Sequence, residues 1–385
     1  MSEHLKALEQ ASGGAAARQS ELQHKLTRLE QWLQASGYDA VLLRRHENLA
    51  WISAGEIQAR VGILSETGVL ALLLLRDGRR FALAPSNEAP RMQAEELVGL
   101  GYELITGPWH AFNVADEATR LGGARVATDA PAASLPVVSL AALRAPLLPA
   151  EIARFRELGR HTADAVAHTL LALQPGVSEY EMEAWLAERL LREGIFPSVL
   201  LMAVDDRILS YKHAVARGAT LQRFGMLNLC TRRWGLVVSI TRFVHFGKLP
   251  TELARGFQTA ALVNAALQHA TRNGATAASL FETAAAAYAQ AGFPGEEQLH
   301  HQGGACGYLE REWVATPGGT QQVRTPEAYA WNPSSRGGKV EDTTLAIADG
   351  THGHIELLTP TPTLPRVHTE CEGSSYVSAG VLVHS

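Results

Sequence analysis

The stretch FGMLNLCTRRWGLVVSITRFVHFG, from Phe224 to Gly247, predicts two consecutive apolar β-strands. Asn228 and Ser239 stand eleven residues apart within it, at positions expected to face inward. Two acids at such positions could bind a metal ion, whereas an amide and a hydroxyl do not supply anionic ligands. The stretch therefore raises the question of what chemistry these strands support without a metal ion.

The composition of the whole chain is that of a globular protein with more than one domain. It has 385 residues, of which 46% are hydrophobic, and this is enough for two cores. The formal net charge is −5, with acids and bases interspersed. This charge argues against binding to nucleic acid or to an anionic membrane surface. Small molecules, peptides and proteins remain as partners.

Cysteine usage and the ends of the chain indicate the cellular setting. Cys230, Cys306 and Cys371 are too few and too dispersed for a disulfide framework, and we expect each to be a small buried hydrophobic side chain. The first residues, MSEHLKALEQASGGAAARQ, lack a cationic start followed by an apolar core, so no signal peptide is recognisable. No segment has the apolar length of a membrane span. A cytoplasmic location is expected.

The first part of the chain predicts a small α/β domain over residues 21–147, after a disordered tail at 1–20. From Leu22 to Leu33, leucines recur at helical spacing, and Gly37 is expected to end that helix. Short β-type runs follow, separated by turns and by the helical stretch NEAPRMQAEELVGLG. These runs are DAVLLR, GVLALLLLRDG, RRFALAP and ARVATDA.

Residues 148–385 predict a second domain of the α+β class. Pro149 lies in the first turn of a long helix, and Ser178 and Glu181 are spaced as a capping box for the next helix. The strands of the opening stretch come next, then helices at about 251–272 and 277–290. Strand-like segments return afterwards as AYAWNP, EDTTLAIADG and IELLTPT. We expect helices to cover one face of an antiparallel sheet.

Several motifs, taken in order, carry a resemblance to a known family. They are Pro-Ala-Glu-Ile before a helix pair, a strand segment ending in TRFVHFG, and then HHQGGACGY, RE, NP and GGKVEDT. This order is similar to that of the pita-bread superfamily of creatinase, prolidase and aminopeptidase P. RHENLAWISAG in the first domain also resembles the creatinase-type N-terminal domain. The resemblance implies that domain followed by a C-terminal pita-bread domain.

The resemblance also implies where metal ligands would stand. Metal-dependent members hold two divalent ions with two aspartates eleven residues apart, one histidine and two glutamates. This chain has Asn228, Ser239, Gly304, Asn332 and Glu341 at those positions, so one carboxylate is kept. One carboxylate and two neutral amides do not offset the cost of dehydrating a hard divalent ion. We therefore expect no dinuclear site, and no metal or other cofactor.

A replacement metal site is the alternative to this expectation. His300, His301 and His245 are its candidates, because adjacent histidines occur in metal centres. Neighbouring residues in a strand point to opposite faces, however. His300 and His301 are therefore not expected to share one ion.

Creatinase, a member without metal, implies a histidine as the acid-base group. That histidine lies on the loop before the first central strand, and the loop DDRILSYKHAVARG places His213 fifteen residues before Asn228. A histidine suits this role because its unperturbed pKa lies near neutrality. The alternative is a loop histidine that caps the site or faces solvent. The glutamates that grip the guanidinium in creatinase fall near Thr241 and Asn332, so creatine is not expected as the substrate.

The implied pocket offers hydrogen-bonding and charged groups. Glu341 and Glu312 join His213 as catalytic candidates. The candidates for substrate binding are Asn228, Ser239, Arg242, His300, Tyr308, Arg311, Asn332 and Lys339. Where a metal enzyme presents cations, the lysine and the two arginines of this set can bind a carboxylate or stabilise developing negative charge.

Three of these residues also have a structural interpretation. Arg242 can pair with Glu341 or Asp342 and hold the sheet together. Glu312 can pair with a nearby cation or a helix end. The amide of Asn332 can tie down the turn before the following proline.

Two classes of function follow from the sequence. The first is a metal-independent hydrolase of the creatinase type, in which His213 activates water, or a substrate group, against a C–N bond in a small carboxylate-bearing molecule or peptide. The second is a catalytically silent pita-bread domain that binds a peptide, small molecule or protein. Inward-facing charges are costly to bury without a use, which favours the hydrolase.

The resemblance also implies a homodimer in which the N-terminal domain of one subunit reaches the pocket of the other. Trp51 and Arg60 are the candidates for this contact. An aromatic residue together with an arginine is typical of interfaces.

Overall fold

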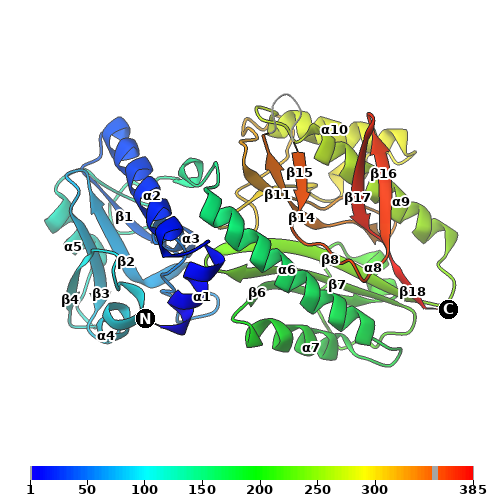
Figure 1. The fold of residues 1–385 in the computed structure, drawn as a ribbon, viewed down its shortest axis with the longest axis horizontal. Helices are drawn as coiled ribbons and strands as arrows, with labels where there is room; N and C mark the ends of the chain where they lie inside the picture. The colour runs from blue at the N-terminus through cyan, green and yellow to red at the C-terminus, as the bar shows by residue number, and fades with distance from the viewer. Residues whose placement is uncertain (1, 349–353, 385) are drawn as a thin grey trace. The chain divides into compact units, whose positions relative to one another are not determined.

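The structure of the protein, a computed structural model, describes residues 2–348 and 354–384 (Figure 1). The chain divides into two compact units, Met1–Arg154 and Phe155–Ser385, within the first turns of the long helix α6 (Pro149–Ala172). No helix within the described ranges combines the length and the apolar character that crossing a membrane requires.

The first unit is built on a five-stranded mixed sheet with the order β4-β3-β2-β1-β5. Its strands are β1 (Ala40–Arg45), β2 (Thr67–Leu75), β3 (Arg80–Pro85), β4 (Glu103–Gly107) and β5 (Val126–Thr128). β1 pairs antiparallel with β2 and parallel with β5. Leu42, Leu73 and Leu83 belong to the core of this sheet, and Ala118 from α5 (Val114–Gly122) packs with them. The α/β class predicted for this part is confirmed.

Helices precede and follow the first strand of this unit. The predicted helix is confirmed as α2 (Ala15–Ser36), which ends at Gly37 in the left-handed conformation with φ 76°. The prediction of a disordered tail is wrong, because residues 3–11 form α1 (Glu3–Ala11) and bury Leu8. The shorter helices are α3 (His46–Ile52), α4 (Ala89–Arg91), η1 (Met92–Glu96) and η2 (Ala141–Leu143).

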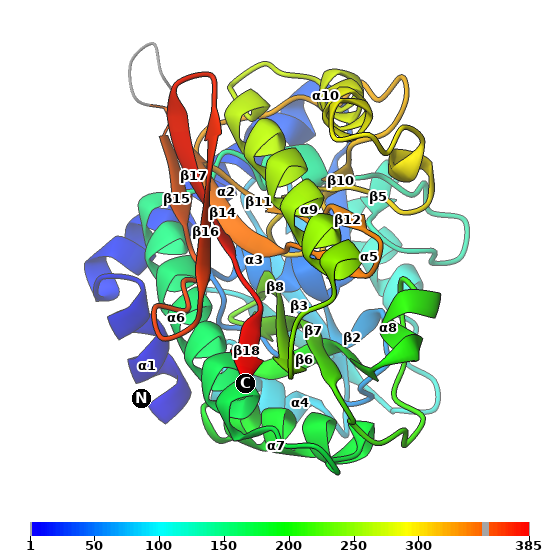
Figure 2. The same ribbon diagram turned by 90° about the vertical axis from the view of Figure 1, so that its right-hand side faces the viewer.

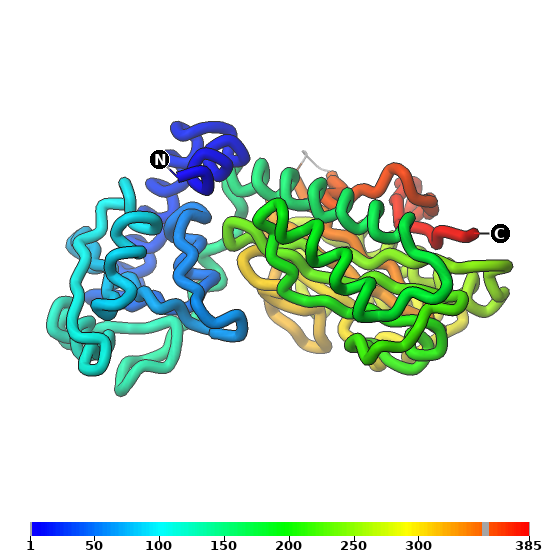
Figure 3. The backbone as a smooth tube through the Cα atoms, turned by 90° about the horizontal axis from the view of Figure 1, so that it is seen from below, coloured from blue at the N-terminus to red at the C-terminus, as the bar shows by residue number. Residues whose placement is uncertain are grey.

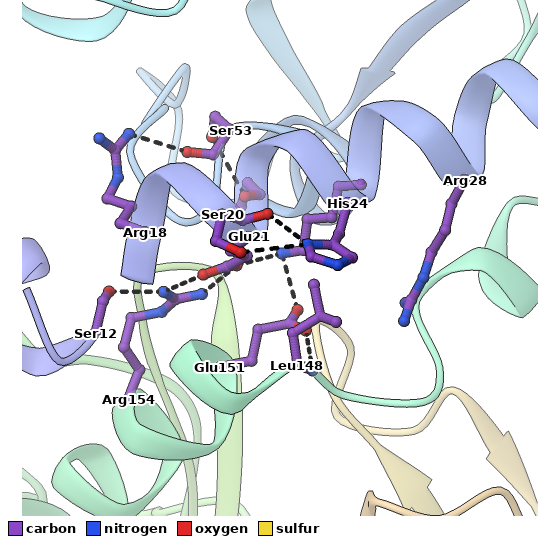
Figure 4. A network of polar contacts seen from close by, with 12 residues as sticks. Ser12, Arg18, Ser20, Glu21, His24, Arg28, Ser53, Leu148, Glu151 and Arg154 are labelled. Carbon is purple, nitrogen blue, oxygen red and sulfur yellow. Dashed lines mark hydrogen bonds and ion pairs between the residues drawn. The ribbon is translucent and has the colours of Figure 1, made fainter. Parts of the chain in front are cut away.

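A buried ion network lies behind the ordered segment that begins with α1. Lys25 Nζ lies 2.5 Å from Glu21 Oε1 and 2.8 Å from Glu151 Oε1, with all three side chains fully buried. Arg154 donates to Glu21 at 2.6 Å and to the Ser12 hydroxyl at 2.8 Å (Figure 4). Burial favours the protonated acid, but Lys25 and Arg154 outweigh it and lower the pKa of Glu21 to about 2. Residues from the start of the chain are thereby tied to the first turns of α6.

The opening stretch of the sequence forms the centre of the second unit. Residues 224–233 and 236–246 are the antiparallel strands β7 (Phe224–Arg233) and β8 (Leu236–Phe246), as predicted. They belong to a four-stranded sheet of order β18-β8-β7-β6, completed by β6 (Phe196–Val204) and β18 (Leu382–His384). β18 runs parallel to β8, so this sheet is not wholly antiparallel.

A second sheet of the same unit has the order β10-β9-β11-β14-β15. Its strands are β9 (Gly303–Cys306), β10 (Trp313–Val314), β11 (Glu327–Trp331), β14 (Asp342–Ile347) and β15 (His354–Leu357). Two small hairpins accompany it: β12 (Ser334–Ser335) with β13 (Gly338–Lys339), and β16 (Arg366–Cys371) with β17 (Ser374–Ala379). A β-bridge between Thr241 and Glu341 and the hydrogen bonds between Ser239 and Thr343 link the two sheets.

Helices cover these sheets from different sides (Figures 2 and 3). α7 (Glu179–Arg192) packs on β6, and its predicted capping box of Ser178 and Glu181 is confirmed. α9 (Thr251–Ala270) packs on both small hairpins and on α10 (Ala277–Gln290). Short α8 (Asp206–Ser210) and η3 (Glu296–Gln298) complete the unit. Of the cysteines, Cys230 and Cys306 are buried as expected, and Cys371 is only partly so.

The network in the first unit allows a stability prediction. Glu21→Gln removes the charge between two fully buried cations, so we expect a loss of about 3 kcal/mol in the free energy of unfolding at pH 7. Because the folded pKa of Glu21 lies below the unfolded value, its contribution is present above pH 4.5 and is lost as the pH falls towards 2. Urea unfolding measures the free energy of unfolding of the parent, of Glu21→Gln and of the control Glu30→Gln. Glu30 is a partly exposed residue on the same helix. Equal stability of the two variants at pH 7 would contradict the prediction.

Candidate functional site

The candidate site begins with one face of the β7–β8 pair. Side chains alternate between faces along a strand, so every second residue shares a side. On one face, the cross-strand partners in register are Met226 with Phe243, Asn228 with Thr241, and Cys230 with Ser239. This face therefore changes from apolar to polar along the strands, and the bridge from Thr241 brings Glu341 to its polar part.

Glu341 is the centre of the polar part. Its Oε2 accepts hydrogen bonds from Thr241 Oγ1 at 2.6 Å and Asn228 Nδ2 at 3.2 Å, and lies 2.9 Å from Lys339 Nζ. Its Oε1 accepts from the Arg311 guanidinium at 3.1 Å. Burial alone raises the pKa of this carboxyl, but Lys339 and Arg311 outweigh it and lower the pKa to about 2. Glu341 is therefore an anion throughout the physiological pH range, with a donor on each oxygen.

Arg311 extends this group to the second polar pair of the strands. The guanidinium donates to Ser239 Oγ at 3.1 Å, and Cys230 Sγ lies 3.2 Å from the same hydroxyl. Burial, and then the charge of Glu341, raise the pKa of Cys230 to about 11. The thiol is protonated at neutral pH and is no nucleophile.

Three histidines form a cluster beside these charges. His213 Nε2 lies 3.0 Å from His300 Nε2, and the rings of His300 and His301 stack with centroids 4.3 Å apart. Burial lowers the pKa of His213, and the charge of Lys339 lowers it further. The same two causes lower the pKa of His300 to about 3. Burial, followed by the charge of Arg311, lowers the pKa of His301 to about 4. All three imidazoles are therefore neutral at pH 7.

This cluster corrects one argument made from the sequence. His300 and His301 were expected to point to opposite faces of a strand. They precede β9, which begins at Gly303, and their rings are tilted by only 26° to each other. Outside a strand the alternation rule does not apply, so both rings reach His213. His245 is elsewhere: its Nδ1 bonds Gly247 O at 3.0 Å, and its ring lies against Phe224.

A small pocket of about 70 Å³ adjoins the histidines. Its lining includes His300, Lys339 and Lys212 beside the apolar Met226 and Phe243. Lys212 donates to Ser334 Oγ at 3.0 Å, and burial lowers its pKa. The sequence reasoning missed Lys212, although its position next to His213 was a usable signal.

Arg242 does not belong to the site. It follows Thr241 in β8 and so points to the opposite face, where it is 1% exposed. Its guanidinium donates to Asp342 at 2.6 Å and to Thr359 O and Thr361 Oγ1 at 2.9 Å each. The prediction of a substrate-binding role is wrong, and the structural interpretation as a partner of Asp342 is confirmed.

Three other predicted site residues lie near β9 and β11. Glu312 Oε1 accepts the backbone N–H of Tyr308 at 3.0 Å, and this closes the loop that carries Arg311. Tyr308 is fully buried, and its carbonyl accepts from Arg232 at 3.0 Å. Asn332 follows β11 and is buried, yet its Oδ1 has no hydrogen-bond partner among the described residues. Its side-chain oxygen therefore does not tie down the turn.

The two predicted contact residues of the first unit differ in exposure. Trp51 is 0% exposed and packs in α3 within the core of its own unit, so its side chain is not offered to another subunit. The expectation for Trp51 is corrected accordingly, because apolar burial within the unit took precedence. Arg60 is partly exposed and stays a prediction.

The residues at the implied metal positions do not fit a pair of divalent ions. Both oxygens of Glu341 already have cationic partners, Lys339 and Arg311. Asn228 turns its amide N–H₂ towards the carboxylate, and Ser239 is engaged by Arg311. A Cβ atom at Gly304 would stand 2.1 Å from the carbonyl oxygen of Trp313, so the backbone leaves no space for a side chain there.

Comparison with known proteins finds sequence similarity to a peptidase family in the second half of the chain. Residues 153–336 match the model of metallopeptidase family M24. A putative Xaa-Pro aminopeptidase from Mycoplasma pneumoniae is 25% identical over 187 residues, which are 46% of this chain and 49% of that protein. The alignment thus spans about half the length of that relative.

Solved structures share the fold over most of the chain. A dipeptidase from Mycobacterium ulcerans superposes with a TM-score of 0.71 at 19% identity, covering 89% of this chain and 96% of the other. The N-terminal domain of a FACT complex subunit from Cicer arietinum superposes with a TM-score of 0.66 at 11% identity, covering 88% and 97%. The fold is an N-terminal domain followed by a pita-bread domain, as the resemblance implied.

The occupied carboxylate yields a prediction about metal content. Mn²⁺ prefers oxygen ligands, and the one carboxylate at the implied positions is neutralised by two side-chain cations. We expect calorimetric titration with Mn²⁺ to show no binding at ion concentrations up to the millimolar range. Elemental analysis of the purified protein should find no pair of manganese ions. Two equivalents of manganese would contradict the prediction.

Proposed function

We propose that the protein is a metal-independent hydrolase that cleaves a C–N bond in a small carboxylate-bearing molecule or peptide. The observation that carries the proposal is the pairing of Glu341 with Lys339 and Arg311, at 2.9 and 3.1 Å. Glu341 is the one carboxylate at the implied metal positions, and the cations that hold it are side chains of the protein. Charge stabilisation in this site therefore comes from the protein itself.

His213 is the proposed acid-base group. Its ring is exposed on one side and bonded to His300 on the other, with 3.0 Å between the two Nε2 atoms. One ring of this pair donates and the other accepts, so His213 has a defined orientation and a neighbour that can share a proton. As a neutral imidazole it takes a proton from water, which attacks the carbon of the C–N bond. The resulting imidazolium then protonates the departing nitrogen.

Lys339 and Arg311 are proposed to hold negative charge. Both are at least partly buried, so their attraction for an anion is screened less than at the surface. A substrate carboxylate or the oxyanion formed by water attack is a suitable partner. Glu341 acts as a positioning residue that keeps the two cations in place.

The match to family M24 supports a hydrolase of peptide-like C–N bonds. The relative named as an Xaa-Pro aminopeptidase suggests a dipeptide or a short peptide as the first substrates to test. The second class of function, binding without turnover, has the likeness to the FACT complex subunit as its support. That likeness concerns the fold alone, so the hydrolase is the stronger proposal.

Replacing the base is the direct test. His213→Asn keeps some hydrogen bonding but cannot accept a proton, so we expect turnover to fall by about 10²- to 10⁴-fold. Mass spectrometry of a panel of Xaa-Pro dipeptides, other dipeptides and N-substituted amino acids would first identify a substrate. His168→Asn, at an exposed position on α6, is the matched control and should retain the parent rate. Full activity of His213→Asn, or no turnover by the parent on any compound that binds, removes the hydrolase proposal.

Glu341→Gln separates positioning from binding. The variant loses the anion between Lys339 and Arg311, so both cations lose their fixed positions while the net positive charge of the site rises. We expect kcat to fall by about 10²-fold, the effect of misplacing a group by about 1 Å. KM for a carboxylate-bearing substrate should not rise, because the added charge favours the anion. A tenfold higher KM with unchanged kcat would instead assign Glu341 to substrate binding.

A further inference from the structure

The cluster of His213, His300 and His301 has a second property beyond acid-base chemistry. Its three nitrogen donors all lie within 4.8 Å of one another, and within residues 2–348 and 354–384 this is the group of potential ligands close enough to share one ion. The cluster uses none of the five positions that the family resemblance assigns to metal. It is therefore a separate candidate for a metal site.

The distances suit a tetrahedral ion. Zinc bound to nitrogen at about 2.0–2.1 Å in a tetrahedron places any two ligand atoms about 3.3 Å apart. His213 Nε2 and His300 Nε2 are 3.0 Å apart, so a small separation of the two rings admits an ion in place of their shared hydrogen. The ring of His301 stacks on that of His300 at an angle of 26° and needs a rotation about χ2, a torsion that is broad for histidine. His213 and His301 are exposed, so the ion has a path from solvent.

The donor set selects a particular class of ion. Three imidazole nitrogens suit Zn²⁺, Cu²⁺ or Ni²⁺, whereas Mg²⁺ and Mn²⁺ prefer oxygen. Three histidines also leave the fourth position of a tetrahedral ion open to water. A zinc-class ion is therefore the ligand that this cluster fits.

The surroundings limit how tightly such an ion is held. Lys339 and Arg311 lie close by and repel a dication, and Glu341 offsets only one of these charges. Tight zinc sites have histidines whose second nitrogen donates to a carboxylate or carbonyl. Here the Nδ1 of His301 accepts the N–H of Gly303 at 3.3 Å, and the Nδ1 of His300 has no partner in the described part of the chain. The site is therefore built for reversible rather than permanent binding.

We propose that one zinc-class ion binds reversibly to His213, His300 and His301 and inhibits the enzyme. Coordination uses the nitrogen lone pair of His213, so a zinc-bound His213 cannot accept a proton from water. The inhibitory part of this proposal rests on the proposed function, whereas the metal site does not. A rise in free zinc would switch the hydrolase off without any change in the fold.

Metal binding is tested without reference to activity. Calorimetric titration of the full-length, tag-free protein with Zn²⁺ should show one equivalent bound, and Mg²⁺ should show none. His301→Gln should weaken zinc affinity at least about tenfold, and the exposed control His168→Gln should leave it unchanged. Co²⁺ bound in place of zinc should give the visible absorption of a four-coordinate, nitrogen-rich site. No zinc binding, or equal affinity in His301→Gln and the control, overturns the metal site.

Inhibition is then measured on any substrate found for the parent protein. Zn²⁺ should lower turnover with the midpoint given by the calorimetric affinity, and excess chelator should restore it. His301→Gln, compared with its own zinc-free rate, should need at least about tenfold more Zn²⁺ for the same inhibition. If zinc binds at the cluster and turnover remains complete, the inhibitory role is overturned. If the parent has no turnover, the hydrolase proposal fails, while the calorimetry alone still decides the metal site.

Discussion

The buried carboxylate of Glu341 and the four donors around it are the interaction on which the candidate site depends. The donors come from different elements: Asn228 from β7, Thr241 from β8, Lys339 from β13 and Arg311 from the segment between β9 and β10. Burying the Lys339 and Arg311 cations without the Glu341 anion would be strongly unfavourable. Without these cations, the buried Glu341 carboxylate would be protonated. A carboxylate next to a cation is the charge pattern of a metal centre. Here the cations are the side chains of Lys339 and Arg311.

Much of the fold followed from local patterns, and the exceptions have a common cause. The strand pair of residues 224–246, the capping box at Ser178 and the stop at Gly37 are decided by residues close in sequence. The order of residues 3–20 is not decided by residues close in sequence. It depends on Arg154, which bonds to Glu21, 133 positions away in the chain. β18 likewise forms only by pairing with β8, far back in the chain. Single-sequence patterns carry no information on such distant partners.

The sequence was a better guide to which residues lie near one another than to the directions of their side chains. Glu341, Arg311, Lys339, Asn228 and Ser239 form one group of polar contacts, and His213 pairs with His300. Arg242 was misassigned because a one-residue step along β8 reverses the direction of the side chain. His300 and His301 were misjudged because the strand was assumed to begin before them, whereas it begins at Gly303. Both errors are errors of register and element boundary, and neither concerns the chemistry of the residues.

The close approach of two backbones at Gly304 limits which residues this position can hold. The carbonyl of Trp313 fills the place where a side chain at position 304 would begin, 2.1 Å from its Cβ. A histidine substituted at this position would require strand β10 to move away from β9. Acids placed at positions 228 and 239 would meet Arg311, which already lies between Ser239 and Glu341. Each of these positions is held by its neighbours, so placing metal-ligating side chains at all three would require coordinated changes around them.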